Sequence, residues 1–263
     1  MPDVLLSLDA PVVIAHRGGA GLRPENTLAA FDHAVALGAD ALECDVHLSR
    51  DGDVVVIHDD TVDRTTNARG PVSAYTAREL QQMDAAWSFA GPGGQASFRQ
   101  QGIGVPRLAE VLGRFPGIPF VIEIKGDDPA FVPHVLDVIR RHRRERDVVL
   151  GGFSHGVLSA VRAQAGEFVT SASITEVRSA VRRAWCGLSP RATGCRLFQM
   201  PVHYHGRRIL RRHLTHAIRR ASLPVHAWVV DDPDEMRQLL DWGVTGLITD
   251  RPDLARDVIL ARR

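Results

Sequence analysis

Cysteine is scarce in this sequence, with three residues among 263. Cys44, Cys186 and Cys195 are scattered, and no pair has the CxxC spacing of a structural zinc site. An odd number of cysteines without a pattern also argues against a disulfide framework. The fold must therefore depend on an ordinary hydrophobic core, which a chain of this length can bury.

A charge excess and long apolar runs are also absent. The formal net charge is +1, which gives no bulk electrostatic reason to expect nucleic acid as a partner. Arginines gather in 140–147 and 206–214, and we interpret both clusters as solvated helix faces. No apolar run reaches membrane-spanning length, so no integral membrane segment is expected. The N-terminal sequence lacks the basic region and small-residue cleavage site of a signal peptide, so a soluble, cytoplasmic protein is predicted.

What the chain does contain is an alternation of short apolar runs with amphipathic helical segments. The runs number about eight, with one hairpin-like departure where Asp51-Gly52 separates 41–48 from 53–59. Repeated strand–helix units imply right-handed crossovers and a parallel sheet. Eight units in about 250 residues predict an α/β fold, the (β/α)8 TIM barrel, rather than an open doubly wound sheet.

Residues 59 to about 105 interrupt this alternation. They contain one short helical pattern, "TARELQQMD", within turn-rich sequence. Because the segment is long for a plain loop, we expect a small inserted subdomain near the mouth of the barrel.

Polar side chains occur where the predicted strands end. They are His16, Arg17, Glu43, Asp45, His58, Glu123, Lys125, Trp228 and Asp250. Functional groups of such barrels lie at the C-terminal ends of the strands. Since strand side chains alternate faces, Glu43 and Asp45 share an inward face, as do Glu123 and Lys125.

These residues have a structural interpretation as well as a catalytic one. A lone histidine is more often structural, and the inward carboxylates could be neutralised by Arg17 and Lys125 in an ion-pair network. The convergence of acids, histidines and cations at successive strand ends favours a functional site. Three carboxylates without thiolates suit one divalent cation, Mg²⁺ or Ca²⁺. A metal ion, a cationic clamp and a histidine pair together describe phosphoester cleavage.

Three blocks of the sequence carry a family resemblance that runs nearly end to end. They are "AHRGGAGLRPENTLAAFDHAVALGADALECDVHLSRDGDVVVIHDDTVDRTT", "VPRLAEVLGRFPGIPFVIEIK" and "AWVVDDPDEMRQLLDWGVTGLITDRP". In order and spacing they resemble the glycerophosphodiester phosphodiesterases. The resemblance implies a single TIM-barrel domain over 1–263, with an insertion at about 59–105 after the second strand.

The resemblance also implies roles for individual residues. Glu43, Asp45 and Glu123 would bind the divalent cation. His16 and His58 would be the general acid and base, in an order that the sequence leaves open. Arg17 and Lys125 would hold the phosphate, and Trp228 would lie beside the glycerol carbons. Small-molecule substrates such as glycerophosphocholine or glycerophosphoethanolamine would be cleaved to glycerol-3-phosphate and an alcohol, through attack of the glycerol 2-hydroxyl and a cyclic phosphate.

Two other functions stay open. A lysophospholipase D would use the same chemistry on an acylated substrate, with Trp87, Phe89 and Phe98 of the insertion either lining its approach or forming a small core. A non-catalytic barrel that binds phosphorylated ligands should lack a catalytic histidine or a metal-binding acid, and neither is lost here. Tyr204 and its two flanking histidines could contact the headgroup or form a surface loop. The oligomeric state is not indicated.

Overall fold

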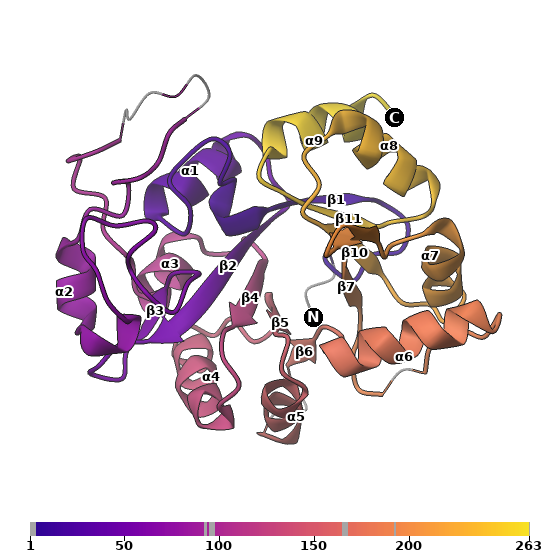
Figure 1. The fold of residues 1–263 in the computed structure, drawn as a ribbon, viewed down its shortest axis with the longest axis horizontal. Coiled ribbons are helices and arrows are strands. Elements are labelled where there is room, and N and C mark those ends of the chain that lie inside the picture. Colours follow the sequence, from indigo (N-terminus) through magenta and orange to yellow (C-terminus); the bar gives the residue numbers. More distant parts are fainter. Residues whose placement is uncertain (1–3, 92–93, 95–97, 165–167, 192, 263) are drawn as a thin grey trace.

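The computed structural model describes residues 4–91, 94, 98–164, 168–191 and 193–262, and its centre is a curled parallel sheet (Figure 1). The parallel strands are β1 (Val12–Ala15), β2 (Ala41–Leu48), β4 (Phe120–Ile124), β5 (Val148–Gly151), β6 (Val169–Thr170), β7 (Phe198–Pro201), β10 (Val225–Trp228) and β11 (Gly246–Thr249). Their order is β6-β5-β4-β2-β1-β11-β10-β7. A parallel bridge between Ser171 and Leu197 joins the two edges of this path. The predicted (β/α)8 barrel is confirmed.

Helices cover the outside of the sheet, and all but the last of them connect one parallel strand to the next, as right-handed crossovers require. They are α1 (Leu28–Ala36), α3 (Leu108–Arg114), α4 (Val132–Arg141), α5 (His155–Gln164), α6 (Ile174–Trp185), α7 (Arg212–Arg219), α8 (Pro233–Asp241) and α9 (Pro252–Leu260). Local sequence determines where they start. Thr27 accepts a hydrogen bond from the backbone N–H of Ala30 at the start of α1, and Asp232 caps α8 ahead of Pro233 in the same way. Among the described helices, none has the length and apolar character needed to cross a bilayer.

The alternation of side chains along the strands divides the core into an inner and an outer layer. The buried inward residues are Val12, Ile14, Ala41, Val121, Val149, Val169, Leu197 and Ile248, with Leu5 from the N-terminal segment among them. Outward residues such as Cys44 and Ile122 pack beneath the helices. Glu43, Asp45 and Glu123 therefore occupy inward positions above an apolar floor.

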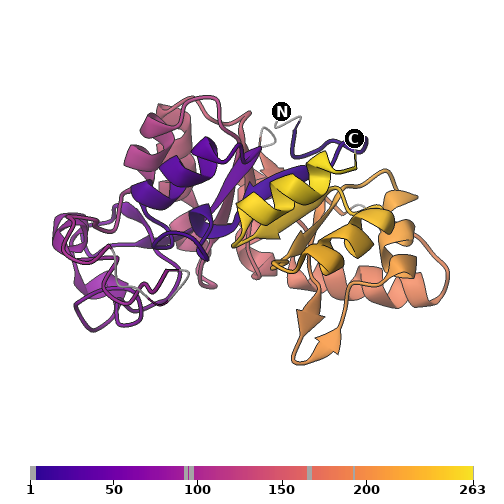
Figure 2. The same ribbon diagram turned by 90° about the horizontal axis from the view of Figure 1, so that it is seen from above.

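The insertion has its own hydrophobic cluster. Strand β3 (Val54–Val56) pairs antiparallel with β2, and the chain then leaves the barrel. The short helix α2 (Ala77–Gln82) lies on the pattern predicted for 76–84. Val55, Val62, Leu80 and Val105 pack together, apart from the barrel core. Figure 2 shows this segment and the hairpin β8 (His203–Tyr204)–β9 (Arg207–Arg208) projecting from the same side of the barrel.

The interpretation of both arginine clusters as solvated helix faces is wrong in part. Arg144 is 5% exposed, and its guanidinium donates to the backbone carbonyls of Leu112 and Phe115 at the C-terminal end of α3. Those carbonyls have no partner within the helix, so the arginine satisfies them. In the second cluster, 207–208 forms β9 rather than helix.

The barrel interior makes one sharp prediction about packing. Gly246 lies directly opposite His226 in the β10–β11 pairing, and His226 is completely buried. A Cβ atom added at Gly246 would lie 2.5 Å from Cδ2 of that imidazole. We expect Gly246→Ala to lower the free energy of unfolding by about 1–3 kcal/mol, the usual cost of overpacking.

Urea titration would measure this loss in the single variant and in Gly246→Ala/His226→Ala. Because the double variant removes the imidazole, it should cost less than the sum of the two single changes. Simple additivity would show that the two side chains do not compete for the same space.

Candidate active site

The loop after β1 places Arg17 beside the acidic residues of β2. Arg17 has a φ angle of 50° in the left-handed region, and its backbone N–H donates to Oε2 of Glu43 at 2.8 Å. Gly18 follows with a φ of +82°, and a Cβ there would lie 2.7 Å from the Cβ of Ala30. The loop needs glycine at that position, because no side chain would fit between it and α1.

Glu43, Asp45 and Glu123 come together as predicted. Each offers a carboxylate oxygen, and these oxygens all lie within 4.8 Å of one another. Glu43 is 4% exposed and Asp45 1%. Oxygen ligands lie about 2.0–2.6 Å from Mg²⁺ or Ca²⁺, so two ligands of one ion are up to about 5 Å apart. The three acids therefore fit a single hard divalent cation.

The ion-pair network that the sequence also suggested is present, but it leaves one of the three acids without a cationic side chain as a partner. Nζ of Lys125 lies 2.8 Å from both Asp45 and Glu123. Nε of Arg17 lies 3.2 Å from Oδ2 of Asp45. Glu43 has neither cation's side chain as a partner, and Nε2 of His16 is 4.0 Å from it. Two permanent cations thus face three carboxylates.

The pKa values follow from this imbalance. Burial, reinforced by the charge of Asp45, raises the pKa of Glu43 from 4.5 to about 8. For Asp45 burial acts in the same direction, but Lys125 and Arg17 outweigh it, and the pKa of Asp45 is lowered. Without a cation, Glu43 is therefore the acid that keeps its proton at neutral pH, and a bound divalent cation would favour its ionised form.

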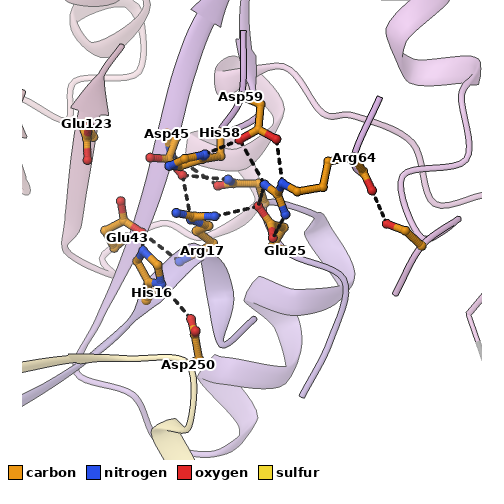
Figure 3. Close-up of polar contacts among 12 residues, drawn as sticks. His16, Arg17, Glu25, Glu43, Asp45, His58, Asp59, Arg64, Glu123 and Asp250 are labelled. Carbon is orange, nitrogen blue, oxygen red and sulfur yellow. Dashed lines mark hydrogen bonds and ion pairs between the residues drawn. The ribbon is translucent and has the colours of Figure 1, made fainter. Parts of the chain in front are cut away.

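Both candidate histidines are held through the same ring nitrogen by an aspartate (Figure 3). Nδ1 of His16 lies 2.7 Å from Oδ1 of Asp250, and Nδ1 of His58 lies 2.6 Å from Oδ1 of Asp59. A carboxylate can only accept, so each Nδ1 carries the proton and each Nε2 is left for another partner. Burial opposes charging of His16, but its hydrogen bond to Asp250 and the charge of Glu43 outweigh burial and raise its pKa.

A chain of ion pairs connects the phosphate-binding candidate to the second histidine. Arg17 contacts Glu25 at 2.9 Å, Glu25 accepts two hydrogen bonds from Arg64, and Arg64 contacts Asp59 at 2.6 Å (Figure 3). Burial opposes ionisation of Asp59, yet hydrogen bonds with Arg64 and His58 lower its pKa to about 2. Asp59 is thus ionised at neutral pH and fixes the tautomer of the imidazole.

A cavity of about 550 Å³ opens over these groups at the C-terminal ends of the strands. All the predicted site residues except Asp45 line it: His16, Arg17, Glu43, His58, Glu123, Lys125 and Trp228. Asp45 lies behind Arg17 and Lys125, which it contacts. The ring of Trp228 packs edge-on against Phe153 with their centroids 6.0 Å apart.

Several contributors to the site were not assigned a role from the sequence. Asp250 directly follows a predicted strand, and Asp59 directly follows the catalytic candidate His58. These positions were the only signal in the sequence that either aspartate belongs to the site. Asn26, next to the α1 cap Thr27, also contributes, because its side-chain amide donates to Oδ2 of Asp45 at 2.9 Å.

The cavity wall formed by α6 was not anticipated, whereas Tyr204 of the β8–β9 hairpin, one of the residues considered for the headgroup, does line the cavity. The aromatic residues of the insertion do not line the cavity. Phe89 and Phe98 contact each other, but Trp87 is 38% exposed beside Arg99, and none of the three belongs to the buried cluster of the insertion.

Comparisons with known proteins agree with this arrangement. A model of the glycerophosphoryl diester phosphodiesterase family matches residues 16–254. A glycerophosphodiester phosphodiesterase of Caldanaerobacter subterraneus subsp. tengcongensis is 33% identical over 248 residues, which cover 92% of this chain and 95% of that protein. Lysophospholipase D GDPD1 of Homo sapiens is 28% identical over 272 residues, covering 94% and 85%. The solved structure of an Oleispira antarctica phosphodiesterase in complex with the product sn-glycerol-3-phosphate has a TM-score of 0.78 and 26% identity, covering 95% and 97%.

The raised pKa of Glu43 predicts how the metal-free protein responds to pH. A carboxyl group whose pKa is higher in the folded chain than in the unfolded chain stabilises the fold at pH values below its unfolded pKa. That contribution is lost as the pH rises towards its folded pKa. Stability should therefore fall between about pH 4.5 and 8 in the presence of a chelator. Glu43→Gln, which resembles the protonated acid, should flatten this dependence and unfold at a higher temperature than the wild type at pH 8.

Thermal unfolding at pH 5 and pH 8 measures the effect. Asp257→Asn, at an exposed position on α9, is the matched control and should behave as the wild type does. Equal pH slopes for the wild type and Glu43→Gln would contradict the assignment of the proton to Glu43.

Proposed function

The chain belongs to the glycerophosphoryl diester phosphodiesterase family, and we propose that it cleaves glycerophosphodiesters such as glycerophosphocholine or glycerophosphoethanolamine. The products would be glycerol-3-phosphate and the free alcohol. The observation that carries this proposal is a cluster of three carboxylates, two of which line a cavity together with two aspartate-held histidines.

Glu43, Asp45 and Glu123 would hold one divalent cation, Mg²⁺ or Ca²⁺. When bound, such an ion polarises a phosphoryl oxygen and takes up negative charge that develops on it. Nζ of Lys125 lies 2.8 Å from Oδ1 of Asp45 and from Oε1 of Glu123. Lys125 would therefore share these two carboxylates with the cation, and a lysine displaced from either of them would be free to bind the phosphate.

Arg17 and Lys125 would bind the phosphate from the cationic side of the cavity. The guanidinium of Arg17 is held by Glu25 and Asp45, so its position is set before substrate arrives. Trp228 offers an apolar ring at the cavity wall, which suits the carbon backbone of glycerol. Groups that are already oriented lose little entropy when substrate binds.

The two histidines would exchange protons with the substrate through Nε2. One accepts the proton of the glycerol 2-hydroxyl as that oxygen bonds to phosphorus, and the other donates a proton to the departing alcohol oxygen. The products of this step are a cyclic phosphate and the free alcohol. In the second step water attacks phosphorus with the histidine roles reversed, and the ring opens to glycerol-3-phosphate.

The other two functions differ in how well the structure supports them. The human relative named a lysophospholipase D favours that activity as the alternative. Trp87, Phe89 and Phe98 of the insertion, which could have lined the approach of an acyl chain, lie outside the cavity lining. A non-catalytic barrel is disfavoured because every proposed catalytic and metal-binding side chain is present and assembled. We also treat residues 1–263 as one catalytic domain with an insertion at about 59–105.

Removal of either imidazole should nearly abolish turnover. General acid–base catalysis contributes about 10²–10⁴-fold, so His16→Ala and His58→Ala should each lower kcat on glycerophosphocholine by that factor. Release of glycerol-3-phosphate is the measurement. His213→Ala, at an exposed position on α7, is the control. Turnover within twofold of wild type in either site variant would remove that histidine from the chemistry.

Removal of the cation should also stop the reaction. Protein stripped with a chelator should be inactive on glycerophosphocholine, and Mg²⁺ or Ca²⁺ added back separately should restore turnover. In Glu123→Gln the added ion should restore less turnover than in the wild type, because one of the three carboxylates is lost. Full activity in a preparation shown by elemental analysis to be free of divalent metal would overturn the cation's role.

A further inference from the structure

The sequence contains one long stretch without an acidic residue. Positions 177–230 hold eleven arginines and no aspartate, glutamate or lysine, in a chain whose formal net charge is +1. The described elements of this stretch are most of α6, the strands from β7 to β10 and helix α7, and they form one sector of the barrel (Figure 1). Positive charge is therefore concentrated on one side of the barrel rather than spread evenly over the molecule.

Two of these arginines, Arg178 and Arg182, line the cavity that contains the proposed catalytic groups. We call them the α6 arginines. They lie about one helical turn apart and both are exposed. Like charges at this spacing destabilise a helix slightly. Within the part of the chain that the structure describes, neither guanidinium has an ion-pair or hydrogen-bond partner, so the chain does not balance their charge locally.

The acids nearest to the α6 arginines in the fold are engaged elsewhere. Glu176, the one acid of α6, is buried and accepts hydrogen bonds from Arg162 and Thr193. The two acids that line the cavity, Glu43 and Glu123, belong to the proposed metal site. A negative partner for the α6 arginines would therefore have to come from outside the protein.

Exposed arginines on other helices illustrate the usual arrangement. Arg114 of α3 lies 2.8 Å from Asp32, and Arg141 of α4 lies 2.8 Å from Asp137 of the same helix. A cation in the last turn of a helix is favourable in itself, but Arg178 lies in the middle of α6, where this effect has faded. Solvation of a helix face alone thus does not account for an unpaired arginine pair beside a cavity.

We propose that the α6 arginines bind an anionic group, a phosphate, carried by the leaving alcohol of the diester. This inference rests on the proposed function, since it takes the phosphodiester that is cleaved to lie at the three carboxylates. A guanidinium presents a planar fork of N–H donors that matches the oxygens of a phosphate. Two such groups suit a doubly charged phosphate monoester, and they would disfavour a cationic headgroup at the same place.

The cavity provides a path from the phosphodiester to this position. From Glu123 on β4 its lining continues across 151–152 at the end of β5 and 171–172 after β6, and then reaches α6. Strands β4, β5 and β6 are neighbours in the sheet. A Cβ atom at Gly151 would lie 3.2 Å from Oε1 of Gln199, so glycine helps to keep this part of the cavity open. The glycerol moiety has no anionic group of its own, so the ligand of the arginines has to come from the alcohol.

The test uses glycerophosphodiesters whose leaving alcohols differ in the charge at their far end. With spacers of two and of four carbons, the alcohol ends either in a hydroxyl or in a phosphate, and glycerophosphocholine supplies the cationic case. Release of glycerol-3-phosphate by the metal-loaded protein gives kcat/KM for each substrate. We expect the wild type to prefer the phosphate over the hydroxyl about tenfold for at least one spacer, because two exposed ion pairs form. The preference should shrink as salt is added, because exposed charges are screened.

Substitution of the α6 arginines should remove this preference. Arg178→Gln/Arg182→Gln should lower the ratio of kcat/KM for the phosphate-ended to the hydroxyl-ended substrate about tenfold, and Arg178→Lys/Arg182→Lys should keep more of it because the charges remain. The control is Arg196→Gln/Arg220→Gln, which removes the same charge from the same acid-free stretch. Both control positions are exposed, outside the cavity lining and ahead of strands β7 and β10, so the wild-type ratio should persist.

The outcomes separate this inference from the proposed function. No turnover of any of these diesters by the metal-loaded wild type would contradict the function itself. Turnover of the choline and hydroxyl-ended diesters without a preference for phosphate would contradict the α6 site alone, as would an equal loss of preference in the control pair. A glutamine pair that keeps the wild-type ratio but no longer binds vesicles of anionic phospholipid would also contradict it, because the arginines would then serve a membrane surface.

Discussion

Everything in the site depends on the repulsion among three clustered carboxylates, two of them buried, that have only two cationic side chains to balance them. Arg17 and Lys125 satisfy Asp45 and Glu123, whereas Glu43 has no cationic side chain as a partner, so its pKa is raised to about 8 and its ionised form is disfavoured. Burying such a charge is costly unless something compensates it. A hard divalent cation would supply that compensation, and under the proposed mechanism the same cation would polarise a phosphoryl oxygen of the substrate.

The barrel makes this arrangement possible because neighbouring parallel strands bring their inward side chains to one level. Asp45 of β2 lies directly opposite Glu123 of β4 in the sheet. The loops that follow other strands then add the remaining groups, with His16 after β1 and its partner Asp250 after β11. An aspartate accepts a hydrogen bond from Nδ1 of each histidine, so the scaffold fixes both tautomers. Ion pairs of Arg64 with Glu25 and Asp59 connect the Arg17 side of the site to the His58 side.

The sequence was most informative where periodicity and chemistry coincided. Alternating polar residues on 41–48 and 120–125 were sufficient to place the acids inward, and the count of strand–helix units was sufficient to predict the barrel. Less could be foreseen where partners lie far apart in the chain. The contact between His16 and Asp250 spans 234 positions, and the burial of Arg144 depends on carbonyls of another helix.

Diffraction from crystals of the protein grown with Mn²⁺ tests the central claim most directly, since anomalous scattering locates the ion independently of any model of the ligands. The account predicts a single strong peak about 2.0–2.6 Å from a carboxylate oxygen of each of Glu43, Asp45 and Glu123. A peak at some other place, with these three acids still bonded only to Arg17 and Lys125 at saturating Mn²⁺, would contradict it.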